Sequence, residues 1–251
     1  MSAKAHAMTI VDELLGSARD DAPVRSVLVG AHCTAVCSRR CGLASTLLGC
    51  LPHGEETVRD VGRLHTKSAR ELAEYVRSAN SLEASIGMAA LNSLIPLDRA
   101  GAPELNALAL LAGKGAGKKV ALVGHFPFVP ELERQVGTLW VLELCPADGD
   151  WPASAATDLI PQADVVGLTS SALINHTFDG LLSLCRPDAF VVALGPTTPL
   201  SPVLFDHGVH VLAGSDVVDE SLALHALGQG ASFREIRGVR RIALAAPGMR
   251  L

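Results

Sequence analysis

Polar side chains follow each of five apolar runs in the second half of the sequence. His125 and Glu143 come just after the first two runs, and Asn175 follows the third. An imidazole in such a loop can ligate a metal or move a proton near neutral pH. The alternative is that it only orders the loop through a hydrogen bond. The other candidates at the run ends are small or hydroxylated residues: Thr169, Ser170, Gly195, Pro196 and Thr197, with Gly214, Ser215 and Asp216 after the fifth run.

The five apolar runs predict the elements that would position these side chains. They lie at residues 120–123, 139–142, 165–168, 190–194 and 209–212, and they recur every 19 to 26 residues. Strands buried on both faces give such unbroken runs, and each interval has room for one helix. We therefore predict a parallel sheet of five or six strands with helices on both faces. Because the carboxyl ends of parallel strands meet at one edge, the candidates should border one pocket there.

The first loop bears on the choice of cofactor. Glu143 lies nineteen residues after Gly124, near the position at which dinucleotide-binding folds hold a ribose hydroxyl with a carboxylate. However, the loop at residues 124–128 lacks the GxGxxG glycines, and prolines flank Phe128. We therefore expect no classical NAD site. A nucleoside-like or other small ligand at the same edge remains open.

Four of the six cysteines lie early in the chain: Cys33, Cys37, Cys41 and Cys50. A four-residue spacing lets thiols share one face of an element, so they could form a soft-metal site. The spacing lacks the CxxC pairs of structural zinc sites, and free cysteine is among the most buried residue types. We predict reduced, mostly buried thiols without a coordinated metal, and the sequence assigns this series no role.

The composition excludes several classes of protein. Of the 251 residues, 49% are hydrophobic and 19% are charged, and the formal net charge is −5. This apolar content excludes a disordered chain, and the acidic balance argues against a nucleic-acid binder. No stretch approaches the roughly 18 apolar residues of a membrane span. Residues 1–11 also contain no hydrophobic signal region. We expect a cytoplasmic protein without membrane insertion.

The first third of the sequence predicts a mixed α+β unit. Capping boxes predict helices that begin after Thr9 and after Ser68, and an alanine-rich segment predicts a helix over residues 82–94. Residues 24–37 predict strands broken at Gly30, and Gly42 is expected to mark a turn. Glycine-rich polar residues at 113–119 predict a connection, so we divide the chain into domains 1–112 and 113–251.

Three segments resemble the DUF4213/DUF364 proteins, a family linked to heavy-metal chelation: residues 83–92, 164–177 and 194–200. Residues 30–34 and 123–127 are consistent with the same family, so the likeness covers nearly the whole chain. The resemblance implies a small enolase N-terminal-like domain followed by a Rossmann-like domain, with a pocket between them. It also implies that Glu83 and Asn92 face His125, Glu143, Asn175 and Gly195.

These observations leave three hypotheses open. The first is a protein that binds a metal or a metal-chelating small molecule, with Glu83, His125 and Glu143 as ligands of a transition-metal ion. The second is an enzyme that acts on a nucleotide-like or other small metabolite, with Glu143 orienting a hydroxyl and His125 as acid or base. The third is a protein whose role is assembly. The sequence does not decide whether a reaction is catalysed, and it leaves the oligomeric state open.

Overall fold

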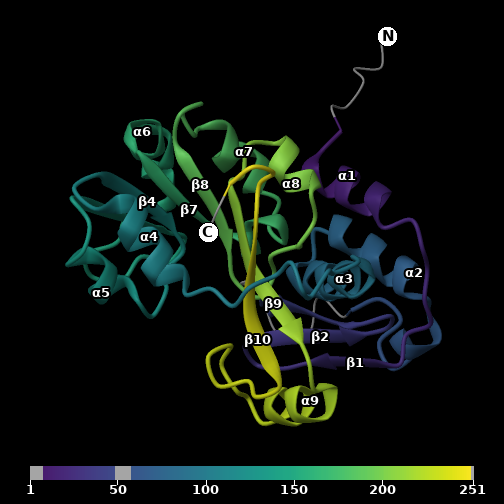
Figure 1. Ribbon diagram of the computed structural model, residues 1–251. Coiled ribbons are helices and arrows are strands. Elements are labelled where there is room, and N and C mark those ends of the chain that lie inside the picture. Colours follow the sequence, from purple (N-terminus) through teal and green to yellow (C-terminus); the bar gives the residue numbers. More distant parts are fainter. Residues whose placement is uncertain (1–7, 49–57, 250–251) are drawn as a thin grey trace.

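Two β-sheets organise the protein in the computed structural model, which describes residues 8–48 and 58–249 (Figure 1). A small antiparallel sheet has the order β1-β2-β3, and a larger sheet has the order β10-β9-β8-β7-β4-β5-β6. The strands are β1 (Ser26–Val29), β2 (Cys33–Cys37), β3 (Cys41–Ser45), β4 (Lys119–Val123), β5 (Thr138–Glu143), β6 (Trp151–Pro152), β7 (Val165–Thr169), β8 (Phe190–Leu194), β9 (Val211–Val217) and β10 (Val239–Ala245).

Nine α-helices and five short 3-10 helices connect these strands within the described residues. The α-helices are α1 (Ile10–Ser17), α2 (Ala69–Ala73), α3 (Ser81–Leu94), α4 (Ala107–Gly115), α5 (Val129–Glu133), α6 (Ala156–Leu159), α7 (Phe178–Ser183), α8 (Val203–Asp206) and α9 (Glu220–Gly228). The 3-10 helices are η1 (Leu64–Thr66), η2 (Glu74–Arg77), η3 (Ala153–Ala155), η4 (Ile160–Gln162) and η5 (Ser170–Leu173). None of the helices in this part of the chain is long and apolar enough to cross a bilayer.

The large sheet confirms the parallel α/β architecture, but it has seven strands rather than the predicted five or six, because β6 and β10 flank the five predicted runs. From β9 to β6 all neighbours are parallel, and β10 pairs antiparallel with β9. The central runs are unbroken because helices cover both faces of the sheet. Leu122 of β4 packs in the core that contains α4 and α5, whereas Ala121 belongs to the core of α1, α7 and α8. The predicted division of the chain at residue 113 stays a prediction.

The predicted end of the fifth run is wrong. β9 continues to Val217, so Gly214, Ser215 and Asp216 lie inside the strand rather than in a loop beyond it. The physical reason is the antiparallel partner β10, which pairs with β9 along its whole length, for example Gly214 with Ile242. The loop after β9 is therefore not part of the group of loops at the other strand ends.

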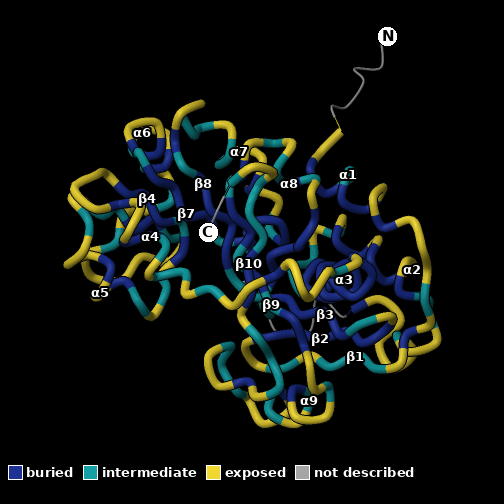
Figure 2. Tube along the Cα trace, in the orientation of Figure 1, coloured by how far each residue is buried: buried dark blue, intermediate teal, exposed yellow. Residues whose placement is uncertain are grey.

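The small sheet is enclosed between two helices that are far apart in sequence. α3 packs on one face, where Val36 and Ala44 are buried. α9 covers the other face, where Cys33, Ala35 and Leu43 form a core with Leu227. Figure 1 shows this order, with α9 beyond the strands opposite to α3. Figure 2 shows α3, β2 and most of β3 as buried, whereas the edge strand β1 is partly exposed. Every residue of β2 is buried because both faces are covered.

Gly42 lies within β3 and not in a turn, which corrects the sequence prediction. The turn between β2 and β3 is at residues 38–40, which ends two positions before Gly42. Gly42 has a packing role instead, because a Cβ atom built on it would lie 2.2 Å from the carbonyl oxygen of Ala89 in α3. The helices predicted after Thr9, after Ser68 and over residues 82–94 are confirmed, and both capping boxes form.

The cysteine prediction is partly wrong. Cys33, Cys37 and Cys41 are buried as expected, and burial raises the pKa of the Cys33 thiol to about 12. Cys37 and Cys41, however, form a disulfide rather than two thiols. The reason is their register, because the two residues are directly opposite each other at the closed end of the β2–β3 hairpin. Cys50 lies outside the described residues.

Reducing the Cys37–Cys41 disulfide is expected to lower the free energy of unfolding by about 2 kcal/mol. That is the chain-entropy value for the short loop closed by a sequence separation of 4. Urea unfolding with and without a reductant measures the difference. A Cys37→Ala/Cys41→Ala variant serves as the control, because it should not respond to the reductant. An equal response of both proteins would contradict the prediction.

Candidate functional site

A group of hydroxyl side chains joins the small sheet to the carboxyl edge of the large one. The Ser45 amide at the end of β3 donates to Thr197 Oγ1 at 2.9 Å, and Ser171 Oγ donates to Ser45 Oγ at 3.0 Å. Behind them, Ser170 Oγ and Thr198 Oγ1 are 2.8 Å apart and buried. We call these five residues the hydroxyl junction. It places the residues that follow β7 and β8 directly against the first third of the chain.

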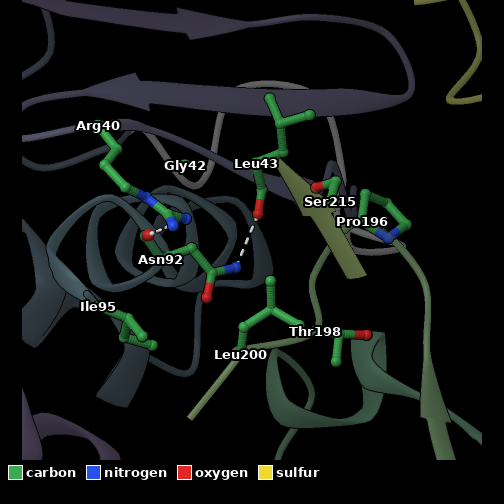
Figure 3. Close-up of a pocket in the computed structure, with 9 residues that line it drawn as sticks. All are labelled: Arg40, Gly42, Leu43, Asn92, Ile95, Pro196, Thr198, Leu200 and Ser215. Carbon is green, nitrogen blue, oxygen red and sulfur yellow. Dashed lines mark hydrogen bonds between the residues drawn. The ribbon is translucent and has the colours of Figure 1, made fainter. Parts of the chain in front are cut away.

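Asn92 ties α3 to the same junction. Its Nδ2 donates to the carbonyl oxygens of Leu43, at 2.8 Å, and Thr197, at 3.0 Å. The side chain is buried, and its Oδ1 has no hydrogen-bond partner in the described structure. Figure 3 shows Asn92 beside a cavity of about 10 Å³ that Arg40 and Pro196 also line. This volume holds about one water molecule, so the cavity is too small for an organic ligand.

His125 lies just beyond β4 and is held by two carboxylates. Its backbone amide donates to Glu143 Oε1 at 2.8 Å, and its ring Nδ1 is 2.9 Å from both oxygens of Asp150. The Asp150 side chain is only 3% exposed, whereas the His125 side chain is 42% exposed. The Leu144 amide donates to Glu143 Oε2 at 2.8 Å, so each oxygen of Glu143 already accepts one backbone N–H. Glu143 therefore orders the two loops, and His125 presents its ring outward.

The loop of His125 and the hydroxyl junction occupy neighbouring positions on one edge. β4 and β7 are paired, with Val123 opposite Leu168. A Cβ atom built on Gly124 would lie 3.1 Å from Cβ of Thr169, so the two loops are in contact where they leave the sheet. Gly124 and Gly195 both have positive φ angles, of 101° and 116°, as the turns at the ends of β4 and β8 require.

Glu83 lies apart from this edge, near the other end of α3 from Asn92. Nine residues of helix separate the two, or about 13 Å along the axis. Its carboxylate accepts from the Arg59 amide at 2.6 Å, from Arg59 Nε at 2.8 Å and from Ser78 Oγ at 2.7 Å. Burial raises the pKa of Glu83, but these hydrogen bonds outweigh it and hold the pKa below its usual value. Glu83 therefore stabilises its own part of the fold.

Asn175 also has a local role in the structure. Its Oδ1 accepts from Thr177 Oγ1 at 2.7 Å and from the Thr177 amide at 3.3 Å, which closes a turn after η5. The following residue, His176, contacts the carbonyl of Ser78 through Nε2 at 3.0 Å. This loop thus packs against the segment that leads into α3.

The structure brings only part of the predicted site together. Ser170 and Thr197 belong to the hydroxyl junction, Asn92 and Pro196 lie next to it, and Thr169 and Gly195 are the chain neighbours of these residues. His125 and Glu143 lie at the neighbouring strand ends. Within residues 8–48 and 58–249, no three His, Cys, Asp or Glu side chains gather closely enough to hold a metal ion. The predicted ligand set of Glu83, His125 and Glu143 is therefore not assembled in this part of the chain.

Two important residues escaped the sequence analysis. Asp150 is twenty-five positions from His125 and belongs to a loop rich in turn residues, so its acidic side chain resembles any solvent-exposed one. Ser45 ends a strand in the first third of the chain, and no local pattern connects it with Thr197. A carboxylate directly before the short strand β6 was the available signal for Asp150, but β6 itself was not predicted.

Two family models match this chain, and together they span most of it. The DUF364 model, whose description is "Putative heavy-metal chelation", matches residues 106–246, and the DUF4213 model, with the same description, matches residues 11–95. An uncharacterized protein of Methanocaldococcus jannaschii is 27% identical over 210 residues, which cover 80% of this chain and 79% of that protein.

Two crystal structures of DUF364 proteins of unknown function have the same fold. The protein from Desulfitobacterium hafniense is 28% identical with a TM-score of 0.83, and the match covers 94% of this chain and 97% of that one. The protein from Pyrococcus horikoshii is 22% identical with a TM-score of 0.77, and the match covers 94% and 98%.

Proposed function

Because this chain belongs to the DUF364 family, whose description is "Putative heavy-metal chelation", we propose that it binds a transition-metal ion or a small molecule carrying one. The proposed place is the carboxyl edge of the large sheet, between His125 and the hydroxyl junction. With the chain divided near residue 113, this place lies between two domains. We propose the cytoplasm as its location.

The observation that supports this proposal best is the pairing of His125 with Asp150. In metal sites, a ligating histidine commonly donates its other ring nitrogen to a carboxylate, which fixes the ring. Here Nδ1 is 2.9 Å from Asp150, and the half-exposed ring leaves Nε2 available as a ligand. An imidazole nitrogen fits a transition-metal ion better than calcium or magnesium. By contrast, Glu83 does not fit this role, because its oxygens already accept three hydrogen bonds.

The hydroxyl junction supports the second part of the proposal. Ser45 and Ser171 are partly buried and Thr197 is fully buried, and the hydroxyl groups of all three can both donate and accept hydrogen bonds. Such groups suit the polar atoms of a small organic molecule, and they are poor ligands for a soft metal ion. The protein would then supply one nitrogen ligand from His125, and the organic molecule would contact the junction.

Replacing His125 with asparagine is expected to weaken binding of Ni²⁺ at least ten-fold. The amide nitrogen of asparagine can take the place of Nδ1 and keep the contact with Asp150, while the ligand atom Nε2 is lost. The free energy of unfolding should change by less than about 0.5 kcal/mol, as for other surface substitutions. Titration calorimetry with Ni²⁺ measures the affinity, and urea unfolding measures the stability.

His225→Asn is the matched control for this experiment. His225 is exposed on α9, where its Nε2 contacts Gln229 rather than a carboxylate. The control should bind Ni²⁺ as the unchanged protein does. Equal Ni²⁺ affinities for the unchanged protein and His125→Asn would reject His125 as the ligand.

An enzyme that acts on a nucleotide-like or other small metabolite is the second candidate function. The same His125–Asp150 pair favours it, since a carboxylate-oriented imidazole is also a common general acid or base. In this case the ligand would be organic and metal-free. Calorimetry with adenosine in place of Ni²⁺ distinguishes the two candidate functions. Only the enzyme hypothesis predicts that adenosine binds and that the His125→Asn variant binds it equally well.

A further inference from the structure

The His125–Asp150 contact determines which ring nitrogen of His125 carries the proton. An ionised carboxylate only accepts hydrogen bonds, so a ring nitrogen 2.9 Å from both Asp150 oxygens must be the protonated one. The unprotonated atom of the neutral ring is then Nε2. In a free imidazole the two tautomers interchange, so this selection comes from the protein.

The loop around Asp150 is built to hold that carboxylate in place. The Ala147 amide donates to Asp150 Oδ2 at 3.1 Å, and the Asp150 amide donates to the Ala147 carbonyl at 3.0 Å. β6 begins with the next residue, Trp151, and pairs with the end of β5. At the other end of the loop, Glu143 accepts from the amides of both His125 and Leu144. Backbone and side chain of His125 are thus both fixed to the same loop.

We propose that Asp150 is the positioning residue of the site: it fixes His125 in the tautomer protonated at Nδ1, so that Nε2 is the atom offered to the metal. This inference rests on the proposed function for its metal partner. Asp150 itself contacts no ligand, because its side chain is 3% exposed and lies behind the ring. Outer carboxylates of this kind typically contribute 10- to 100-fold to metal affinity.

The test compares Asp150→Ala with Asp148→Ala. Asp148 is exposed in the same loop and is therefore the matched control. The first measurement is the tautomer of His125, obtained from ring ¹⁵N shifts of ¹⁵N-histidine-labelled protein at pH 8, without metal. The unchanged protein and Asp148→Ala should show the Nδ1-protonated ring. In Asp150→Ala the ring should change to the Nε2-protonated form that predominates in free histidine.

The second measurement is the affinity for Ni²⁺ by calorimetry. Asp150→Ala is expected to bind about 10- to 100-fold more weakly. For Asp148→Ala the change should stay below about two-fold. A third variant, Asp150→Asn, covers the case in which alanine disturbs the loop, since its amide keeps the shape of the carboxylate and removes the charge. It should also weaken binding.

The outcomes separate this inference from the function on which it rests. An Nε2-protonated ring in the unchanged protein, or an Nδ1-protonated ring retained in Asp150→Ala, would overturn the role of Asp150. Ni²⁺ affinities that stay unchanged in both Asp150 variants would overturn it as well. The expected tautomers together with no Ni²⁺ binding by any variant would instead reject the proposed metal function, while the ring assignment would stand.

Discussion

Replacing Gly42 with alanine is expected to lower the free energy of unfolding by about 4 kcal/mol or more, because no local shift can relieve the clash. The new Cβ atom would lie 2.2 Å from the carbonyl oxygen of Ala89 and 2.4 Å from the amide nitrogen of Ser93. Both are backbone atoms of α3, so the whole helix would have to move away from β3. Urea unfolding measures the loss. The movement should also weaken the contact of Asn92 with Thr197.

Gly16→Ala is the matched control for this substitution. Gly16 is exposed in α1, and a Cβ atom built there has no neighbour within 4 Å. Alanine favours the helix over glycine by up to about 1 kcal/mol, so this variant should be slightly more stable. If Gly42→Ala unfolds at the same urea concentration as the unchanged protein, the close packing of α3 on β3 is wrong.

Replacing Glu83 with glutamine is expected to cost about 3 kcal/mol of unfolding free energy at pH 7. The carboxylate is buried and accepts hydrogen bonds from Arg59 and Ser78. Hydrogen bonds to charged groups contribute more than neutral ones, and the amide of glutamine would also face these donors with its own N–H groups. Since Glu83 does not reach the proposed site, Ni²⁺ affinity should not change.

The loss should depend on pH in a defined direction. The pKa of Glu83 in the folded protein lies below its ordinary value of 4.5. The stabilisation is therefore fully present above about pH 4.5, and it disappears as the pH falls through the lowered value. The unfolding curves of the two proteins should converge in that acidic range.

Glu74→Gln, at an exposed ion pair with Arg77, is the control and should change stability by less than about 0.5 kcal/mol. Curves that keep a constant separation from pH 7 into that acidic range would contradict this account.

The large sheet could be predicted because its signal is local. Each buried strand needs an unbroken apolar run. For the runs at residues 120–123 and 165–168, no other element explains the pattern as well as a buried strand does. The length of β9 could not be predicted in the same way. Its second half contains Ser215 and Asp216, which are tolerated in the sheet because β10 pairs with them and because Arg99 neutralises Asp216. Both partners are remote in sequence.

The candidate site was predictable only as an edge, and not as a set of contacts. Parallel topology places His125, Glu143, Thr169 and Gly195 at strand ends on one side, and this follows from the order of the runs. Whether a polar side chain is free to bind a ligand or is already hydrogen-bonded within the protein depends on residues that are remote in sequence. Glu83 is occupied by Arg59, from a segment with no recognisable pattern, and His125 is oriented by Asp150. In the same way, a spacing of four residues does not reveal the hairpin register that places Cys37 opposite Cys41.

The position of α9 over the small sheet has a consequence for how the chain folds during synthesis. β1, β2 and β3 lie between residues 26 and 45, but the core on their outer face needs Val217, Leu227 and Ile236. A ribosome has therefore made nearly two hundred further residues before that face can be covered. Until then Cys33, Ala35 and Leu43 have no partner on that side. The usual order, in which the N-terminal part folds first and by itself, does not apply here, because the last helix completes the first sheet.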